Sequence, residues 1–390
     1  MLNFRLSIFC IKGVHLNRNL WVIILTSAVF AVCMGVYDFV MPIYLKEINI
    51  SFANMGIIFG FSSVLIYFLR LYVGVHSDRI GRKPFYTMGL LFSALGNILT
   101  PIFGSLIPLT IVKTVREASL IVRDTMRSIL VYENGKKNFL NLISKTVGME
   151  FFLQGIGTMI GGLIATRSAF FACGIALFIS CIFFLAFFKE DFKPIKSEKT
   201  ALKFKDLLKI DLPPKLKNLT LAMFIMTLGM NISHCFIMPL FFIQKFGISI
   251  ADAAVVLMIH RMLLGVPMFI YGNFMKGRNL KFIYIVTMLY EALAISAAAL
   301  IPNFWIAVTV WLTHDLFGAA FWSPIQNHYI QEFAREKSRG RDVSEAVALS
   351  SLGAVIAPFI AGALAPIDIS LPFLVSGIVT GLTVIPLFKL

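Results

Sequence analysis

The sequence predicts an all-α membrane protein of twelve transmembrane helices in two six-helix bundles, and three observations lead to this fold class. The 390 residues are 58% hydrophobic and only 14% charged, so the chain is far more apolar than a soluble domain. Apolar stretches of about 20 residues, the length that crosses a bilayer, recur along the whole chain. Lysine and arginine gather in every second loop between these stretches.

The apolar stretches place the twelve helices in order. We expect them at about residues 20–45, 53–76, 84–103, 105–132, 141–165, 167–188, 217–243, 248–272, 281–301, 303–330, 343–364 and 368–388. With the N-terminus inside the cell, 25 of the 35 Lys and Arg residues fall in cytoplasmic segments and 3 in outer loops. This bias predicts a multi-pass protein of the cell membrane with both termini in the cytoplasm. It also accounts for the net charge of +15 without a nucleic-acid partner.

The longest polar segment divides six helices from six. We expect an N-terminal bundle over residues 1–188, a cytoplasmic linker over 189–216 and a C-terminal bundle over 217–390. Within the linker, residues 201–210 have the composition of a short amphipathic helix on the inner membrane surface.

The fourth helix carries a stripe of charge. At about 100° per residue, its charged side chains fall within an arc of roughly 120°. They are Lys113, Arg116, Glu117, Arg123, Asp124 and Arg127. Each ion would cost about 3 kcal/mol or more in lipid, so the stripe must face protein or a watery cavity.

The loop after the second helix contains a recognisable motif. Its residues Gly74, Asp78, Arg79, Gly81, Arg82 and Lys83 have the spacing G-x-x-x-D-R-x-G-R-K. This resembles the signature between helices 2 and 3 of the major facilitator superfamily, and the twelve helices and central linker extend the resemblance over essentially the whole chain. The resemblance implies two pseudo-symmetric halves around a central cavity, with this loop and Arg127 acting as a gate. Glu133 and Asp124 are the candidate partners of Arg82.

A weak internal repeat supports the same arrangement. Residues 272–278 form a degenerate copy of the motif, and Gly272 lies 198 residues after Gly74. The copy lacks the aspartate, so we expect an asymmetric gate. The same separation relates Arg116–Glu117 to His314–Asp315.

Glycines in the fifth and eleventh helices form a packing motif. Gly148, Gly157 and Gly161 have the spacing G-x8-G-x3-G, which resembles the antiporter motif of twelve-helix drug–proton exporters. The motif is incomplete, because Gly162 stands where that family has proline. In the eleventh helix Gly353, Pro358 and Gly362 repeat the pattern of small residues that permits close helix crossing.

Buried acids are the candidates for proton coupling. The resemblance places helices 1, 4, 7 and 10 around the cavity, which favours Asp38, Glu117, Asp124 and Asp315. Asp38 is the first choice, because no basic residue shares its helical turn.

The same four helices supply candidate substrate contacts. They are Tyr37, Arg116, Arg123, His234, His314 and Trp311. A lining that mixes aromatic and charged side chains suits amphiphilic organic molecules.

Other functions find less support in the sequence. No nucleotide-binding or hydrolase motif occurs, and we expect no enzyme activity, no cofactor and no metal site. One alternative is Cu(I) transport, since Met226 and Met230, like His234 and Met238, share a helix face.

The sequence therefore predicts an alternating-access transporter that acts as a monomer in the lipid bilayer. Proton-coupled export of a small amphiphilic molecule is the leading interpretation. Uptake of an organic anion by symport or exchange is the alternative, and a non-transporting membrane receptor is a third.

Overall fold

The structure is a computed structural model that describes residues 17–135, 139–190, 211–265, 275, 277–335 and 339–390. Within these ranges the side chains of 65–68, 70–76, 78–79, 135, 139–141, 144, 339–341 and 344 are not described. The predicted amphipathic helix at 201–210 and most of the second-half loop copy, including Gly272, lie outside the described residues.

Each of the twelve predicted spans contains helix, and the described residues contain no strand. The N-terminal half consists of α1 (Arg18–Glu47), α2 (Phe52–Ile80), α3 (Lys83–Leu99), the short η2 (Thr100–Ile102), α4 (Leu106–Gly135), α5 (Phe139–Leu163) and α6 (Thr166–Phe187). The C-terminal half consists of α8 (Pro214–His234), α9 (Ile237–Phe246), α10 (Ile250–Gly265), α12 (Leu280–Leu300), α13 (Phe304–His314), η4 (Asp315–Ala319), α14 (Ala320–Phe333), α15 (Arg339–Leu364), α16 (Leu371–Leu382) and α17 (Val384–Leu387).

Two of the C-terminal spans are interrupted, which the hydropathy pattern did not predict. The seventh span is split into α8 and α9, which meet at a bend of 45°. The tenth span is split by η4, a five-residue π-helical turn between α13 and α14. Both interruptions fall near polar residues, His234 and Asp315, and π-helical turns occur frequently at functional sites.

Hydropathy identifies only part of this bundle as membrane-spanning. Six helices of the described chain are long and apolar enough to cross a bilayer, and the bent pair α8–α9 makes a seventh. The helix α4 is not among them, because its charged stripe lowers its hydropathy.

Local sequence signals set several helix ends. The Asn17 side chain accepts a hydrogen bond from the amide of Leu20 at the start of α1, and Asn279 caps α12 in the same way. The helix α2 ends at Ile80 and is followed by Gly81, whose positive φ of 106° suits a residue without Cβ.

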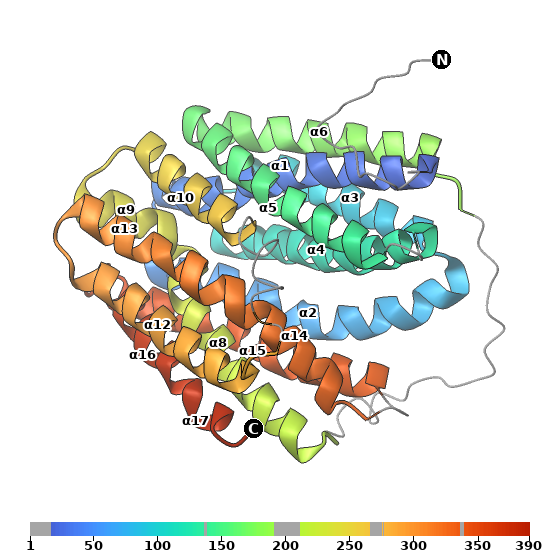
Figure 1. The fold of residues 1–390 in the computed structure, drawn as a ribbon. Coiled ribbons are helices and arrows are strands. Elements are labelled where there is room, and N and C mark those ends of the chain that lie inside the picture. Colours follow the sequence, from blue (N-terminus) through green and yellow to red (C-terminus); the bar gives the residue numbers. More distant parts are fainter. Residues whose placement is uncertain (1–16, 136–138, 191–210, 266–274, 276, 336–338) are drawn as a thin grey trace.

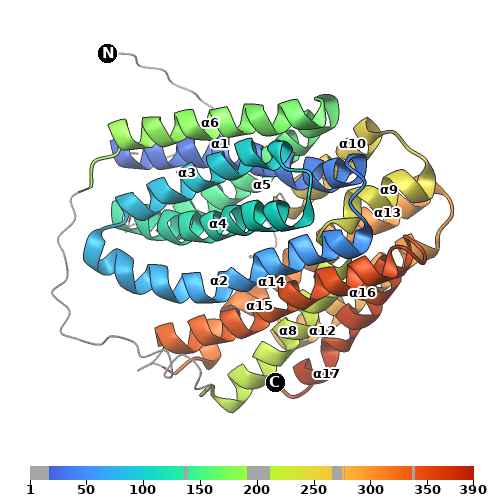
Figure 2. The same cartoon turned by 180° about the vertical axis from the view of Figure 1, so that it is seen from behind.

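The two halves lie side by side and meet along two helix pairs (Figures 1 and 2). One pair is α5 with α10, and the other is α2 with α15. Glycine permits the close approach of α2 and α15, because a Cβ on Gly56 would lie 2.5 Å from the carbonyl oxygen of Pro358. Gly56 and Gly362 both lie at the ends of their helices that are remote from the loop at Gly81–Lys83.

Candidate functional site

A cavity of about 240 Å³ lies where the two halves meet. Its wall combines apolar side chains with ionisable groups from both halves. The ionisable and phenolic groups are Tyr37, Asp38, Lys113 and Glu117 of the N-terminal half, and His234, His260 and Arg261 of the C-terminal half. The polar stripe of α4 therefore reaches the cavity through Lys113 and Glu117.

Asp38 joins the halves electrostatically. One carboxylate oxygen lies 3.7 Å from an Arg116 nitrogen in its own half, and the other lies 3.6 Å from an Arg261 nitrogen in the opposite half. Both distances exceed a normal hydrogen bond, so these are loose ion pairs. The sequence shows no basic residue on the same helical turn as Asp38, whereas the fold places two arginines from other helices beside it.

Arg116 lies behind the cavity wall. Its side chain is about 1% exposed, and its guanidinium carbon lies 3.4 Å from the centre of the Tyr37 ring. Stacking of this kind is a favourable cation–π contact. Arg116 also lies 3.2 Å from Glu117, which accepts a hydrogen bond of 2.6 Å from Lys113. Arg116 thus positions Tyr37, Asp38 and Glu117.

The C-terminal part of the α4 stripe, residues 123–127, forms a separate ionic cluster around Glu150 of α5. One oxygen of Glu150 accepts a 2.8 Å hydrogen bond from Arg123, and the other is bonded by Arg127. Arg123 also donates to Asp124 at 2.7 Å and to Ser27 of α1 at 2.6 Å. Arg123 is about 1% exposed and does not reach the cavity wall, although we expected a substrate contact.

The motif loop at the end of α2 is hydrogen-bonded to Glu190, which follows α6. The backbone amides of Arg82 and Lys83 both donate to the Glu190 carboxylate. The Arg82 side chain pairs with Glu133 of α4 at 3.0 Å, which is one of its two expected partners. The other, Asp124, pairs instead with Arg123 and Arg127. The side chains of Asp78 and Arg79, and the surroundings of Gly74, lie outside the described part of the chain.

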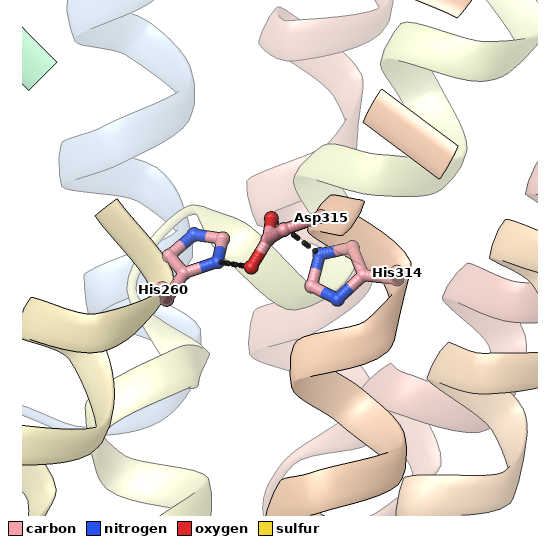
Figure 3. Close-up of side chains that lie close together, drawn as sticks. All are labelled: His260, His314 and Asp315. Atoms are coloured by element: carbon pink, nitrogen blue, oxygen red, sulfur yellow. Dashed lines mark hydrogen bonds and ion pairs between the residues drawn. The ribbon is translucent and has the colours of Figure 1, made fainter. Parts of the chain in front are cut away.

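A second polar centre lies within the C-terminal half (Figure 3). Asp315, which is 0% exposed, accepts a 2.7 Å hydrogen bond from Nδ1 of His260. Its other oxygen lies 3.5 Å from Nε2 of His314. Trp311 packs against both imidazoles, with ring centres 4.7 Å and 5.1 Å away. Of the predicted residues here, His234 reaches the cavity wall, whereas Trp311, His314 and Asp315 lie behind it.

Sequence reasoning missed His260 and its relation to Asp315. The only signal was a polar pair, His260–Arg261, within an otherwise apolar helix. Glu291 of α12 is also fully buried here. One of its oxygens lies only 1.6 Å from where a Cβ on Gly318 would be, so the glycine of the π turn makes room for it.

The helix-packing glycines divide between two kinds of contact. Gly157 and Gly161 pack against α1, and Gly353 packs against α8, so these three hold helices of one half together. Gly362 packs against α2 of the opposite half, and Pro358 presents its carbonyl to Gly56 there.

On the α5–α10 contact, Gly148 lies opposite Gly265. Two glycines outside the expected motif, Gly155 and Gly162, contact α10 directly.

The fold and the site define the class of protein. Two helical halves that enclose a charged cavity within the membrane are the architecture of a secondary transporter. A sequence profile of the Major Facilitator Superfamily matches residues 4–122 and 144–341. The chain therefore belongs to the Major Facilitator Superfamily, whose members are multi-pass membrane transporters of small molecules and are generally not enzymes. The predicted family and fold class are confirmed.

Individual relatives are distant but cover nearly the whole chain. Multidrug resistance protein 2 of Bacillus subtilis (strain 168) is 22% identical in an alignment of length 386 that covers 94% of each chain. A mutant of the nucleoside transporter NupG superposes with a TM-score of 0.78 at 12% identity, over 96% of this chain and 98% of that one.

Two further solved structures share the fold. The D-xylose–proton symporter gives a TM-score of 0.73 at 14% identity, covering 95% of this chain and 98% of that one. An inward-facing bacterial homologue of the human lysosomal transporter Spinster gives 0.72 at 15% identity, covering 95% and 94%. At these identities the structural likeness shows the fold alone.

Proposed function

We propose that this protein exports a small amphiphilic organic molecule in exchange for protons, by alternating access between the two faces of the membrane. The observation that carries this proposal is the position of Asp38, a cavity carboxylate held between Arg116 of one half and Arg261 of the other. The relative named as a multidrug resistance protein supports the direction of transport.

Asp38 links protonation to the contact between the halves. As a carboxylate it attracts both guanidinium groups, and therefore holds α10 toward α1. A proton on Asp38 removes its charge and weakens both ion pairs, so the halves separate more easily. The long N–O distances fit this role, because a loose pair is released at lower cost than a buried bidentate one.

The cavity wall suits an amphiphilic substrate. Apolar contacts come from both halves, with Met34 and Phe59 facing Met238 and Leu257. Charged groups lie among them at Asp38, Lys113 and Glu117. A molecule with an apolar body and a polar group can therefore displace water from the apolar surface and still satisfy its polar end.

The contacts between α2 and α15 support a conformation in which the two halves are closed together at one face of the membrane. Gly56, Pro358 and Gly362 bring the halves together at the membrane face remote from the motif loop. With both termini in the cytoplasm, as the loop charges favour, this closed face is the outer one. Opening this face requires α2 and α15 to part, while the motif loop and the Glu150 cluster keep the N-terminal half intact. We propose that a single chain, acting as a monomer, carries out the whole alternating-access cycle.

Transport in proteoliposomes with an imposed pH gradient tests the proposal. Asp38→Asn keeps the size of the side chain but removes its ability to exchange a proton. We expect gradient-driven transport to be abolished, while exchange of labelled for unlabelled substrate without a gradient remains measurable. Asp252→Asn is the matched control, because Asp252 lies at the exposed start of α10. Gradient-driven transport by Asp38→Asn at the wild-type rate would overturn Asp38 as the coupling group.

One observation favours a second candidate, uptake or exchange of an organic anion. Around the cavity, the cations Lys113, Arg116 and Arg261 outnumber the carboxylates Asp38 and Glu117 by one. An anionic substrate would balance this charge.

Lys113→Met separates the two candidates. Lys113 lines the cavity, and its loss removes the excess positive charge there. If the substrate is an anion, we expect its Kd to rise by roughly 10-fold or more, because a hydrogen bond to a charged group contributes about 1.5–3 kcal/mol, whereas binding of a neutral amphiphile should change little. Equal affinities of the variant and the wild type for every anion tried would exclude the second candidate.

A further inference from the structure

Three imidazoles of the C-terminal half converge, although they come from three different spans, and two of them, His260 and His314, lie against the Asp315 carboxylate. His234 ends α8, His260 lies in α10 and His314 ends α13 beside Asp315. The three ring centres form a nearly regular triangle with sides of 5.5, 5.6 and 5.8 Å. Histidines that are buried independently of one another have no reason to converge in this way.

Hydrogen bonds to the backbone fix which ring nitrogens are free. Nδ1 of His314 contacts the carbonyl oxygen of Trp311, and Nδ1 of His234 lies 2.9 Å from the carbonyl oxygen of Met230. A carbonyl can only accept, so Nδ1 carries the hydrogen in both rings. The Nε2 atoms of neutral His234 and His314 are therefore acceptors. A backbone hydrogen bond from the second nitrogen is the usual support of a metal-ligating histidine.

Nε2 of His314 faces a second acceptor, an oxygen of Asp315, without a donor between them. Nε2 of His314 lies 3.5 Å from an oxygen of Asp315, and both atoms offer lone pairs. Among the described residues, that oxygen and Nε2 of His234 are buried and have no hydrogen-bond partner. Such an arrangement of lone pairs is stabilised when a positive ion lies among them.

We propose that this centre binds a divalent transition-metal ion of the Zn²⁺ type. The ligands are Nδ1 of His260, Nε2 of His314 and the Asp315 carboxylate, whose ligand atoms lie within 4.8 Å of one another, and water from the cavity completes the coordination. His260 takes part as the tautomer with its hydrogen on Nε2, so the ion replaces the hydrogen that now joins Nδ1 to Asp315. Imidazole and carboxylate ligands favour Zn²⁺ and its neighbours over Mg²⁺ or Ca²⁺.

The distances fit a tetrahedral ion. Bonds of about 2.0–2.1 Å place tetrahedral ligand atoms about 3.3 Å apart, and two such imidazole rings about 5 Å apart. The two measured N–O separations, 2.7 Å and 3.5 Å, run to the two different oxygens of Asp315 and bracket the first value. The ring centres of His260 and His314 lie 5.5 Å apart, close to the second value.

Charge and access also fit the ion. The described ion pairs of Asp315 are both with histidines, and the nearby carboxyl of Glu291 adds a second buried acid. His234 and His260 line the cavity, so an ion can enter from it. Because its ligands come from α10, from α13 and from the π turn η4, the ion would link α10 to the interrupted tenth span.

Metal titration of the purified, detergent-solubilised full-length protein tests the proposal without any transport assay. After removal of metal by a chelator, we expect one Zn²⁺ per chain by calorimetry and the strong visible absorption of four-coordinate Co²⁺. Excess Mg²⁺ or Ca²⁺ should not displace either ion. Affinity should fall as the pH is lowered, because protons compete for the imidazole lone pairs.

Variants locate the ion. His260→Ala, His314→Gln and Asp315→Asn should each weaken binding by about 100-fold or more, since loss of a mere supporting residue already costs 10- to 100-fold. His328→Gln is the control, because His328 is exposed on α14 and remote from the centre. A Zn²⁺-dependent rise in the melting temperature of the wild type gives a readout that does not depend on variant folding.

Two results would overturn the proposal. One is a wild type that binds no Zn²⁺ or Co²⁺ after chelation. The other is binding that survives unchanged in the double variant His260→Ala, His314→Gln. Either result leaves the proton-coupled transport proposal standing, because that proposal is judged by gradient-driven flux through Asp38 variants.

Discussion

The two halves of this transporter share a framework but differ in their polar centres. In the N-terminal half the centre is built from guanidinium and carboxylate groups, with Arg116 and Arg123 almost fully buried. At the position related by 198 residues, Arg116–Glu117 is replaced by His314–Asp315. A guanidinium keeps its charge at all accessible pH values, whereas an imidazole can gain or lose a proton or bind a metal. The basic groups of the first centre thus carry fixed charge, and those of the second carry variable charge.

The backbone differs in the same places. The helices α1 and α4 run without a break through Asp38 and Arg116. Their counterparts in the second half are interrupted, one at Cys235–Phe236 between α8 and α9, and the other by the π turn that begins at Asp315. Phe236 is the residue 198 positions after Asp38. The half with the guanidinium centre is therefore the one with continuous helices, and the half with the imidazole centre contains the bends.

The largest expected difference between the halves is in stability. Arg123→Met removes one partner of buried Glu150, whose remaining partner is Arg127. Breaking a buried pair costs about 3–5 kcal/mol, and we expect the lower end because Arg127 stays. Thermal denaturation in detergent measures the loss. Arg167→Met, at an exposed arginine at the start of α6, is the control and should have little effect.

The corresponding change in the second half should cost less. His260→Leu removes the hydrogen-bond partner of Asp315, but a proton can then neutralise this acid. We expect a loss of stability clearly smaller than that of Arg123→Met. An equal or larger loss would contradict the contrast between fixed and variable charge.

The framework, by contrast, should respond in the same way in both halves. Gly157 of α5 lies against α1, where a Cβ would be 2.1 Å from the Val32 carbonyl oxygen. Gly353 of α15 lies against α8, where a Cβ would be 2.5 Å from the Leu228 amide. Backbone atoms cannot rotate away, so Gly157→Ala and Gly353→Ala should each cost about 1–3 kcal/mol. Gly104→Ala is the control, since no atom lies within 4 Å of its Cβ position.

The smallest expected effects are at two helix caps, and these should also match. Ser51 accepts a hydrogen bond from the amide of Asn54, and Ser249, 198 residues later, accepts one from the amide of Asp252. Ser51→Ala and Ser249→Ala should each lower stability by about 1 kcal/mol. Melting curves of the two variants should overlay; a difference of several degrees would mean that the asymmetry extends beyond the centres.

The fold was predictable because hydropathy, the charge of the loops and one loop motif can be read directly from the linear sequence. Apolar runs located helix in each of the twelve expected segments, and the internal repeat placed Arg116–Glu117 and His314–Asp315 at equivalent positions of the two halves. The contacts of these groups were not predictable in the same way. Arg261 lies near Asp38, and Glu150 contacts Arg123, because of the angles at which their helices rotate and cross. These angles cannot be read from the order of residues along the chain.

The interruptions were missed for a related reason. Hydropathy is nearly the same whether a segment forms an α-helix or contains a π turn, so the breaks at Cys235 and Asp315 leave no trace in it. His260 was missed because one imidazole in an apolar helix gains meaning only from Asp315 and His314, which lie in another span.

The hydrogen bonds from Arg82 and Lys83 to Glu190 have a practical consequence for anyone who wishes to divide the molecule. Glu190 follows α6, at the beginning of the segment that joins the halves, yet its carboxylate closes the loop between α2 and α3. Co-expression of the halves as two polypeptides therefore needs a junction after Glu190. A junction placed only a few residues earlier would deprive the first fragment of the group that holds its own loop.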